Sequence, residues 1–189
     1  MVVKQLVTAE QLWELPDILG KQLELVRGEV VAVPSPGAIH NVIANLLFHL
    51  LYTFASERRL GIVFGDNMGY VLSRGPDTVR IPDISFVAWD RVPEAGIPEG
   101  SWLIPPDLAV EVVSPSDHTA DVNDKACEYV ASGVPLAWVL WPKRRVVSVY
   151  TRDQMVRELG LDDELDGGDT LPGFSVRVST LFDIPMRPE

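Results

Sequence analysis

A single carboxylate, Glu111, lies in the middle of an apolar run, LAVEVV, that is otherwise typical of a buried β-strand. An isolated carboxylate loses much favourable hydration when it leaves water. A buried one therefore needs an ionic partner, a metal ion or a shifted pKa. The fold must bring such a partner to this strand, and the rest of the sequence can be searched for it.

The length and composition of the chain are those of one ordinary folded domain. Its 189 residues are 47% hydrophobic and 23% charged, which allows a substantial core and argues against disorder. We expect a single domain over residues 1–189. Within it we expect an N-terminal helix and β-hairpin (1–36), a core with a second helix (37–142) and a C-terminal β extension (143–189).

The compartment and the charge limit the classes of partner. The one cysteine, Cys127, excludes an internal disulfide, and the first residues lack the long apolar segment of a secretory signal, so we expect a cytoplasmic protein. The apolar stretch 39–54 carries His and Asn at helical spacing, which predicts a core helix and no membrane span. A net charge of −11 argues against a broad basic face for nucleic acid but leaves room for a local basic groove.

Turn and cap signals predict the N-terminal elements. Thr8 and Gln11 have capping-box spacing, which predicts a short helix that ends at Pro16. QLELV and EVVAV flank Arg27 and Gly28 and predict a β-hairpin. A long helix should follow, with Ser35 as its N-cap, Pro36 in its first position and a wide apolar face.

Three strands and a second helix are predicted next. IVFGDN, GYVLS and VRIPDISFVAW have the pattern of consecutive antiparallel strands, and LAVEVV follows them. A helix is expected from Asp121 to Ser132, with Gly133 ending it. PLAWVLW and VVSVYT continue the sheet, and MVREL and FSVRVSTLF add short β pieces. This order predicts an α/β domain in which helices flank a mixed sheet.

The acidic residues near Glu111 include one candidate for a shared metal site. Asp107 is four residues away on the same strand, which separates the two by roughly 13 Å and is too far for one ion. Asp83 lies in VRIPDISFV, a strand expected beside LAVEVV. Two carboxylates at about 4 Å repel each other by roughly 4 kcal/mol at an effective dielectric near 20. A divalent cation removes that cost, and carboxylate oxygens suit Mg²⁺ or Mn²⁺.

Structural roles compete with this interpretation. Asp83 could cap a turn or pair with Arg80, and Glu111 could be the partner of an arginine. Lys125 could be an exposed helix lysine. A hydrolytic triad from residues 114–118 (SPSDH) is disfavoured, because triads are assembled from distant segments and near neighbours in a loop are usually turn formers.

The motifs, in order, resemble a known nuclease family. The segments that carry the resemblance are LELVRGEVV, SPGAIH, RIPDISFVAWDR, PPDLAVEVVSPSD, DKACEYVASGVPLAWVLWP and LPGFSVRVSTLF. They span most of the chain and resemble the PD-(D/E)xK nuclease superfamily, in particular its Uma-type restriction-endonuclease-like family. The resemblance implies a restriction-endonuclease-like core, an α/β (α+β) fold with a mixed β-sheet flanked by helices.

The resemblance also implies roles for particular residues. Asp83 and Glu111 would bind Mg²⁺ (or Mn²⁺), with the backbone carbonyl of Val112 as a further ligand. The superfamily lysine usually stands two residues after the Glu, where this chain has Val113; the Uma-type pattern places it in the next helix, at Lys125. Supporting positions are Glu29, His40 and Tyr129, the last one helical turn beyond Lys125.

These expectations lead to two functional hypotheses. The first is a Mg²⁺-dependent endonuclease that hydrolyses phosphodiester bonds in DNA, acting as a homodimer, as is common for nuclease folds of this type. The second is a catalytically silent module on the same fold that binds nucleic acid or a protein. They differ in whether Asp83, Glu111 and Lys125 converge on one accessible pocket.

Overall fold

The structure is a computed structural model that describes residues 6–15, 22–153 and 155–184. Its helices are α1 (Ala9–Trp13), α2 (Ala38–Arg58), the 3-10 turn η1 (Trp89–Arg91), α3 (Thr119–Ala131) and α4 (Val178–Leu181). Its strands are β1 (Gln22–Val26), β2 (Glu29–Val33), β3 (Gly61–Phe64), β4 (Tyr70–Ser73), β5 (Thr78–Arg80), β6 (Ile84–Ala88), β7 (Leu108–Val112), β8 (Leu136–Trp141), β9 (Val146–Thr151), β10 (Val156–Leu159), β11 (Glu164–Asp166) and β12 (Ser175–Arg177).

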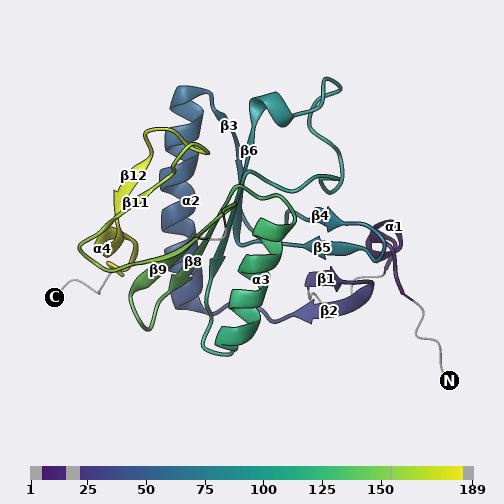
Figure 1. The fold of residues 1–189 in the computed structure, drawn as a ribbon, viewed down its shortest axis with the longest axis horizontal. Helices are drawn as coiled ribbons and strands as arrows, with labels where there is room; N and C mark the ends of the chain where they lie inside the picture. Colours follow the sequence, from purple (N-terminus) through teal and green to yellow (C-terminus); the bar gives the residue numbers. More distant parts are fainter. Residues whose placement is uncertain (1–5, 16–21, 154, 185–189) are drawn as a thin grey trace.

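A six-stranded mixed sheet forms the centre of the molecule. Its strand order is β10-β9-β8-β7-β6-β3, and β7 and β8 are its parallel pair. Parallel neighbours need a long crossover connection, which α3 provides between them. Figure 1 shows α2 behind this sheet and α3 in front of it. The predicted mixed sheet flanked by helices is confirmed.

The alternation of side chains along the strands produces two cores, one on each face of the sheet. On β8, Leu136, Trp138 and Leu140 pack into the core that includes α2, whereas the residues between them pack into the core beneath α3. On β7, Val110 and Val112 belong to the α2 face. Glu111 lies between them in the strand and is therefore directed to the α3 face.

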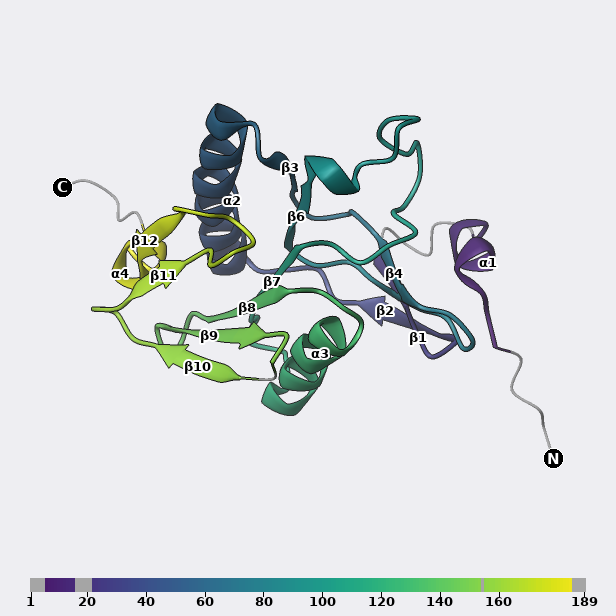
Figure 2. The same cartoon turned by 45° about the horizontal axis from the view of Figure 1, so that its top comes forward.

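A second sheet, with strand order β2-β1-β5-β4, stands at one end of the molecule. Figure 2 shows it beside α1, with β11, β12 and α4 at the opposite end. The β1–β2 hairpin turns at Arg27 (φ 50°) and Gly28 (φ 81°), the two positive φ values that a tight two-residue hairpin turn requires. The predicted hairpin is thus confirmed.

The prediction of one continuous strand over VRIPDISFVAW was wrong. The run divides into β5, in the four-stranded sheet, and β6, in the six-stranded sheet. Pro82 has no N–H for a strand ladder, so the chain leaves one sheet at Ile81 and enters the other at Ile84. The predicted antiparallel pairing of GYVLS with the following strand is confirmed for β4 and β5, but IVFGDN does not pair with GYVLS, because β3 pairs with β6. Asp83 lies at the crossing between the two sheets.

Several predicted helix ends shift. The N-cap of α2 is Gly37 rather than Ser35, because the Asn41 N–H donates to the Gly37 carbonyl and starts the helix there. α1 ends at Trp13, and its predicted end at Pro16 lies outside the described residues. The end of FSVRVSTLF is the helix α4 rather than a strand, since Val178 and Leu181 are buried at helical spacing.

Within the described ranges, α2 is the one helix long and apolar enough to cross a membrane. Such a helix alone is a weak indication of a span. Ile43, Leu47 and Leu51 are fully buried on the face that packs on the six-stranded sheet, as the prediction of a core helix requires.

Candidate functional site

Glu111 finds its partners on α3. Its side chain is 13% exposed, and its Oε1 accepts hydrogen bonds from the Tyr129 hydroxyl at 2.7 Å and from Lys125 Nζ at 2.9 Å. Lys125 and Tyr129 are four residues apart and share a helix face, so both side chains reach the same carboxylate. The partner that the buried strand required is therefore an ammonium from the crossover helix.

Asp83 lies next to Glu111 through the pairing of β6 with β7. Ile84 is opposite Val110, and one step along the same antiparallel register places Asp83 opposite Glu111. Oδ2 of Asp83 accepts the N–H of Val112 at 2.7 Å and Nε2–H of His40 at 3.0 Å. The strand and α2 thus hold one oxygen of this carboxylate in a fixed direction.

The two carboxylates have the donor set for a hard divalent cation. Within the described ranges, no hydrogen bond reaches Oδ1 of Asp83 or Oε2 of Glu111, although both side chains are largely buried. No group of three or more His, Cys, Asp or Glu side chains is arranged to hold a metal among these residues. One or two carboxylates, with water and substrate phosphate completing the shell, are the usual protein ligands of Mg²⁺. The residues therefore fit such a cation.

Lys125 has a second carboxylate partner that the sequence analysis did not identify. Its Nζ lies 2.9 Å from Oε1 of Glu24, which comes from β1 in the other sheet. Arg80 on β5 then joins Glu24, at 2.8 Å, to Glu128 on α3, at 2.6 Å. Arg80 therefore pairs with these two glutamates rather than with Asp83. One signal was available in the sequence, because Glu24 stands between Leu23 and Leu25 as Glu111 stands between two valines.

These contacts shift the ionisation of the acidic groups. Burial raises the pKa of Glu111 to about 7; Lys125 opposes the shift and the Asp83 charge adds to it. Burial also opposes ionisation of Glu24, but Lys125 and Arg80 outweigh it and hold the pKa of Glu24 below its usual value. The pKa of Lys125 is raised, because its two carboxylates outweigh burial. Of these two glutamates, Glu111 is thus the more easily protonated.

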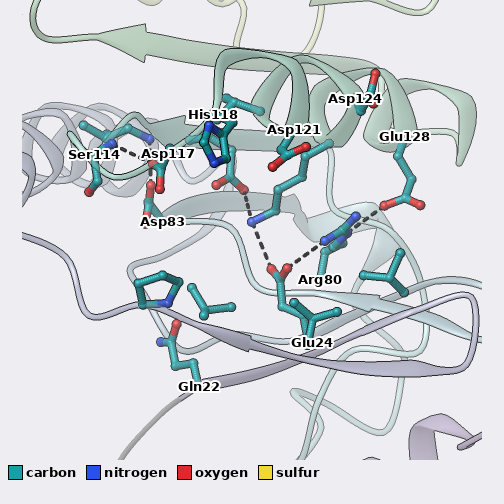
Figure 3. Close-up of a pocket in the computed structure, with 18 of the residues that line it drawn as sticks. Gln22, Glu24, Arg80, Asp83, Ser114, Asp117, His118, Asp121, Asp124 and Glu128 are labelled. Atoms are coloured by element: carbon teal, nitrogen blue, oxygen red, sulfur yellow. Dashed lines mark hydrogen bonds and ion pairs between the residues drawn. The ribbon is translucent and has the colours of Figure 1, made fainter.

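The cluster opens into a cleft of about 1020 Å³ between β1 and β2 on one side and α3 on the other. Figure 3 shows Glu24 and Arg80 directed toward one another, with Asp121, Asp124 and Glu128 on the helix across from them. Eight carboxylates and three basic side chains line the cleft, the basic ones being Arg27, Arg80 and Lys125. A polyanion could enter such a cleft only with positive charge supplied from outside the chain.

The structure brings most of the predicted site residues together. Asp83, Glu111, Val112, Lys125 and His40 line the same cleft, and Tyr129 lies directly behind it. Glu29, the first residue of β2, is exposed and is not among the lining residues.

Neighbouring polar residues have structural roles. Asp117 accepts the N–H of Ser114 at 2.7 Å, the geometry of a turn, as expected for SPSDH. Asp107 pairs with Arg91 at 2.7 Å, away from Glu111.

Two comparisons with known proteins gave matches, one to a solved structure and one to a sequence family. The chain resembles a solved structure from Anabaena variabilis ATCC 29413, described as "a putative nuclease belonging to DUF820", with a TM-score of 0.82. The two are 22% identical, and the alignment covers 93% of this chain and 97% of the other, which shows a shared fold. No curated protein matches. The sequence model of the Uma2 family, described as "Putative restriction endonuclease", matches residues 9–179. The chain therefore belongs to the Uma2 family of restriction-endonuclease-like proteins.

Proposed function

We propose that the protein is a Mg²⁺- or Mn²⁺-dependent endonuclease that hydrolyses phosphodiester bonds in DNA. The observation that carries the proposal is the convergence of Asp83, Glu111 and Lys125 on one cleft. Each carboxylate has one oxygen held by the protein and one without a partner among the described residues. The family description and the nuclease-like fold support the same class of reaction.

Asp83 and Glu111, with the carbonyl of Val112, would hold the cation. When bound, the cation supplies charge neutralisation at a phosphate and increases the acidity of water. It would also offset the excess of carboxylates around the cleft, so that a nucleic acid backbone can approach.

The side chains of the cleft would contribute orientation and positive charge. Lys125 is the cationic group beside Glu111, and its ammonium can donate hydrogen bonds to the attacking water and to oxygens that gain charge as the phosphodiester bond breaks. Tyr129 fixes the rotamer of Glu111, while His40 and the Val112 N–H fix that of Asp83. These contacts would maintain the site before substrate arrives, which reduces the reorganisation needed for reaction.

Calorimetric titration with Mn²⁺ and Mg²⁺ tests the metal site directly. We expect the wild type to bind Mn²⁺ and both Asp83→Asn and Glu111→Gln to lose that binding, because each removes one ligand charge. Glu94→Gln, an exposed carboxylate outside the cleft, is the matched control and should bind as the wild type does. Loss in both site variants would justify cleavage assays on DNA and RNA with the bound metal.

The opposite result would favour the alternative function. A wild type that binds neither ion, alone or together with DNA, would contradict the endonuclease and leave a silent binding module on this fold. Retention of full Mn²⁺ affinity in both variants would place the ion elsewhere. The homodimer and the cytoplasmic location expected from the sequence stay predictions, and sedimentation of the purified protein would test the first of them.

A further inference from the structure

Glu24 is held in the cleft more firmly than a surface carboxylate could be. Its side chain is 4% exposed and accepts from three donors. Oε1 accepts the Ile81 N–H and Lys125 Nζ, each at 2.9 Å, and Oε2 accepts Arg80 Nη1 at 2.8 Å. Nothing in the metal site as described above uses this residue.

The ammonium of Lys125 is shared equally between two carboxylates from different sheets. It lies 2.9 Å from Glu24 on β1 and 2.9 Å from Glu111 on β7. Glu111 is also a ligand of the proposed cation, so the ammonium and the cation compete for its charge. Among the described residues, the hydrogen bonds of Glu24 go to Ile81, Arg80 and Lys125 and not to the proposed metal ligands. Glu24 can therefore keep its hold on the ammonium when Glu111 turns to the metal.

We propose that Glu24 is a positioning residue that keeps the Lys125 ammonium in the cleft when a divalent cation occupies Asp83 and Glu111. The proposal rests on the endonuclease function proposed above. Without Glu24, Lys125 would pair with Glu111 alone. The cation would then have to break that pair, and the freed lysine would have no anchor beside the phosphate. With Glu24 present, the ammonium moves only from two partners to one.

Arg80 gives Glu24 the rigidity that this role needs. Its guanidinium spans from Glu24 to Glu128, so the β1 carboxylate is tied to the same helix that carries Lys125. Glu128 belongs to the same network, and among the described residues no hydrogen bond or ion pair joins it to Lys125. Glu128→Gln is therefore a matched control, in which a carboxylate of the network is neutralised and the lysine contact stays in place.

A double-mutant cycle on Mn²⁺ affinity tests the proposal without a cleavage assay. We expect Glu24→Gln to weaken Mn²⁺ binding about tenfold or more, because Lys125 then neutralises Glu111 alone. In a Lys125→Met background the same change should weaken binding by no more than about threefold, since no ammonium remains to be held. Glu128→Gln should bind within about twofold of the wild type.

Glu24→Asp separates the contact from the charge. It keeps the carboxylate but withdraws it by one methylene from Lys125, so a positioning role predicts a loss close to that of Glu24→Gln. Circular dichroism and thermal melting of each variant establish that it is folded. If Glu24→Gln does not fold, Glu24→Asp carries the same comparison in the two Lys125 backgrounds.

The outcomes separate this inference from the proposed function. Equal losses with and without Lys125, or full affinity in Glu24→Asp, would overturn the positioning role and leave Glu24 as a source of charge only. If Glu24→Gln keeps the Mn²⁺ affinity of the wild type while Asp83→Asn does not bind Mn²⁺, the positioning role of Glu24 would be overturned. The proposed metal site would still be supported. A wild type that does not bind Mn²⁺ would overturn both.

Discussion

At the scale of single residues, the site is built from groups that the fold alone would not favour. Glu111 replaces an apolar side chain on the α3 face of β7 and is surrounded by further carboxylates. Burial raises its pKa to about 7, so ionising it near neutral pH costs folding free energy. A bound cation would favour the ionised form. A carboxylate that is costly to the empty protein and suited to a cation is characteristic of a functional site.

The pH dependence of stability should reveal this cost. Because the pKa of Glu111 is raised above its ordinary value of 4.5, its protonated form stabilises the fold below pH 4.5, and that stabilisation is lost as the pH rises toward 7. The amide of a Glu111→Gln variant cannot ionise. The unfolding free energy of Glu111→Gln relative to wild type should therefore grow by about 1–3 kcal/mol between pH 4.5 and 8. Urea unfolding with a chelator measures it, and a pH-independent difference would contradict the expectation.

His40 should affect metal affinity through Asp83. Its imidazole is 7% exposed and donates to Oδ2 of Asp83. This hydrogen bond orients the carboxylate and therefore sets the direction in which its other oxygen, Oδ1, points. Groups that orient a ligand in this way typically change metal affinity by about 10–100-fold when they are removed. We expect His40→Ala to weaken Mn²⁺ binding by about that factor in calorimetry. His49→Ala, an exposed position on the same helix, should leave it unchanged; equal effects would point to helix damage instead.

At the scale of elements, the close pairing of β3 with β6 fixes where Asp83 enters the sheet. Gly61 faces Ala88 in this pair, and a Cβ at Gly61 would overlap the carbonyl oxygen of Val87. Because the obstruction is backbone, it cannot rotate away as a side chain would. Asp83 directly precedes β6, so a shift of this strand would also move the site.

Gly61→Ala should therefore destabilise the protein by about 1–3 kcal/mol, the usual cost of forced overlap in a packed region. Chemical denaturation of the variant measures the change. The control is Gly100→Ala, where an added Cβ would meet no atom within 4 Å and the backbone has no positive φ. A Gly61→Ala variant as stable as the control would show that β3 is free to move away from β6.

The elements with local signals could be predicted from the sequence, and the contacts between sheets could not. The hairpin about Gly28 and the helix ending before Gly133 depend on a few adjacent residues, and both are present. The division of VRIPDISFVAW between two sheets depends on the pairing of β5 with β1 and of β6 with β3, and both partners are separated from it by other elements of the chain. Glu24 was missed for the same reason, since its partners Arg80 and Lys125 are distant in sequence and periodicity carries no information about them.

At the scale of the whole molecule, the cleft is a boundary between two sheets that share α3. The six-stranded sheet supplies Glu111, the four-stranded sheet supplies Glu24, and α3 supplies the lysine between them. Arg80 crosses the same boundary, with a side chain that is 14% exposed. The ion pairs that form the candidate site are thus also a connection between the two parts of the fold.

Removing the Arg80 guanidinium from this boundary should destabilise the protein more than removing the guanidinium of an exposed arginine. In Arg80→Met, the buried Glu24 loses its guanidinium partner, and breaking a buried pair from one side typically costs about 3–5 kcal/mol. Arg144 and Glu158 form an exposed pair, 54% and 48% accessible, so Arg144→Met should cost less than about 1 kcal/mol.

The stability loss in Arg80→Met should also depend on pH, in a direction that the ionisation of Glu24 determines. Lys125 and Arg80 hold the pKa of Glu24 below 4.5, so its ionised form stabilises the fold above that pH, and this stabilisation is lost as the pH falls through the lowered value. The penalty of Arg80→Met should therefore be largest near neutral pH and shrink below pH 4.5, where Glu24 becomes protonated in the variant. Denaturation of wild type, Arg80→Met and Arg144→Met from acidic to mildly alkaline pH measures both effects. If Arg80→Met and Arg144→Met lower the unfolding free energy by the same amount at every pH, the connection between the sheets would depend on apolar packing. The ion pairs would then contribute to the candidate site and not to the stability of the fold.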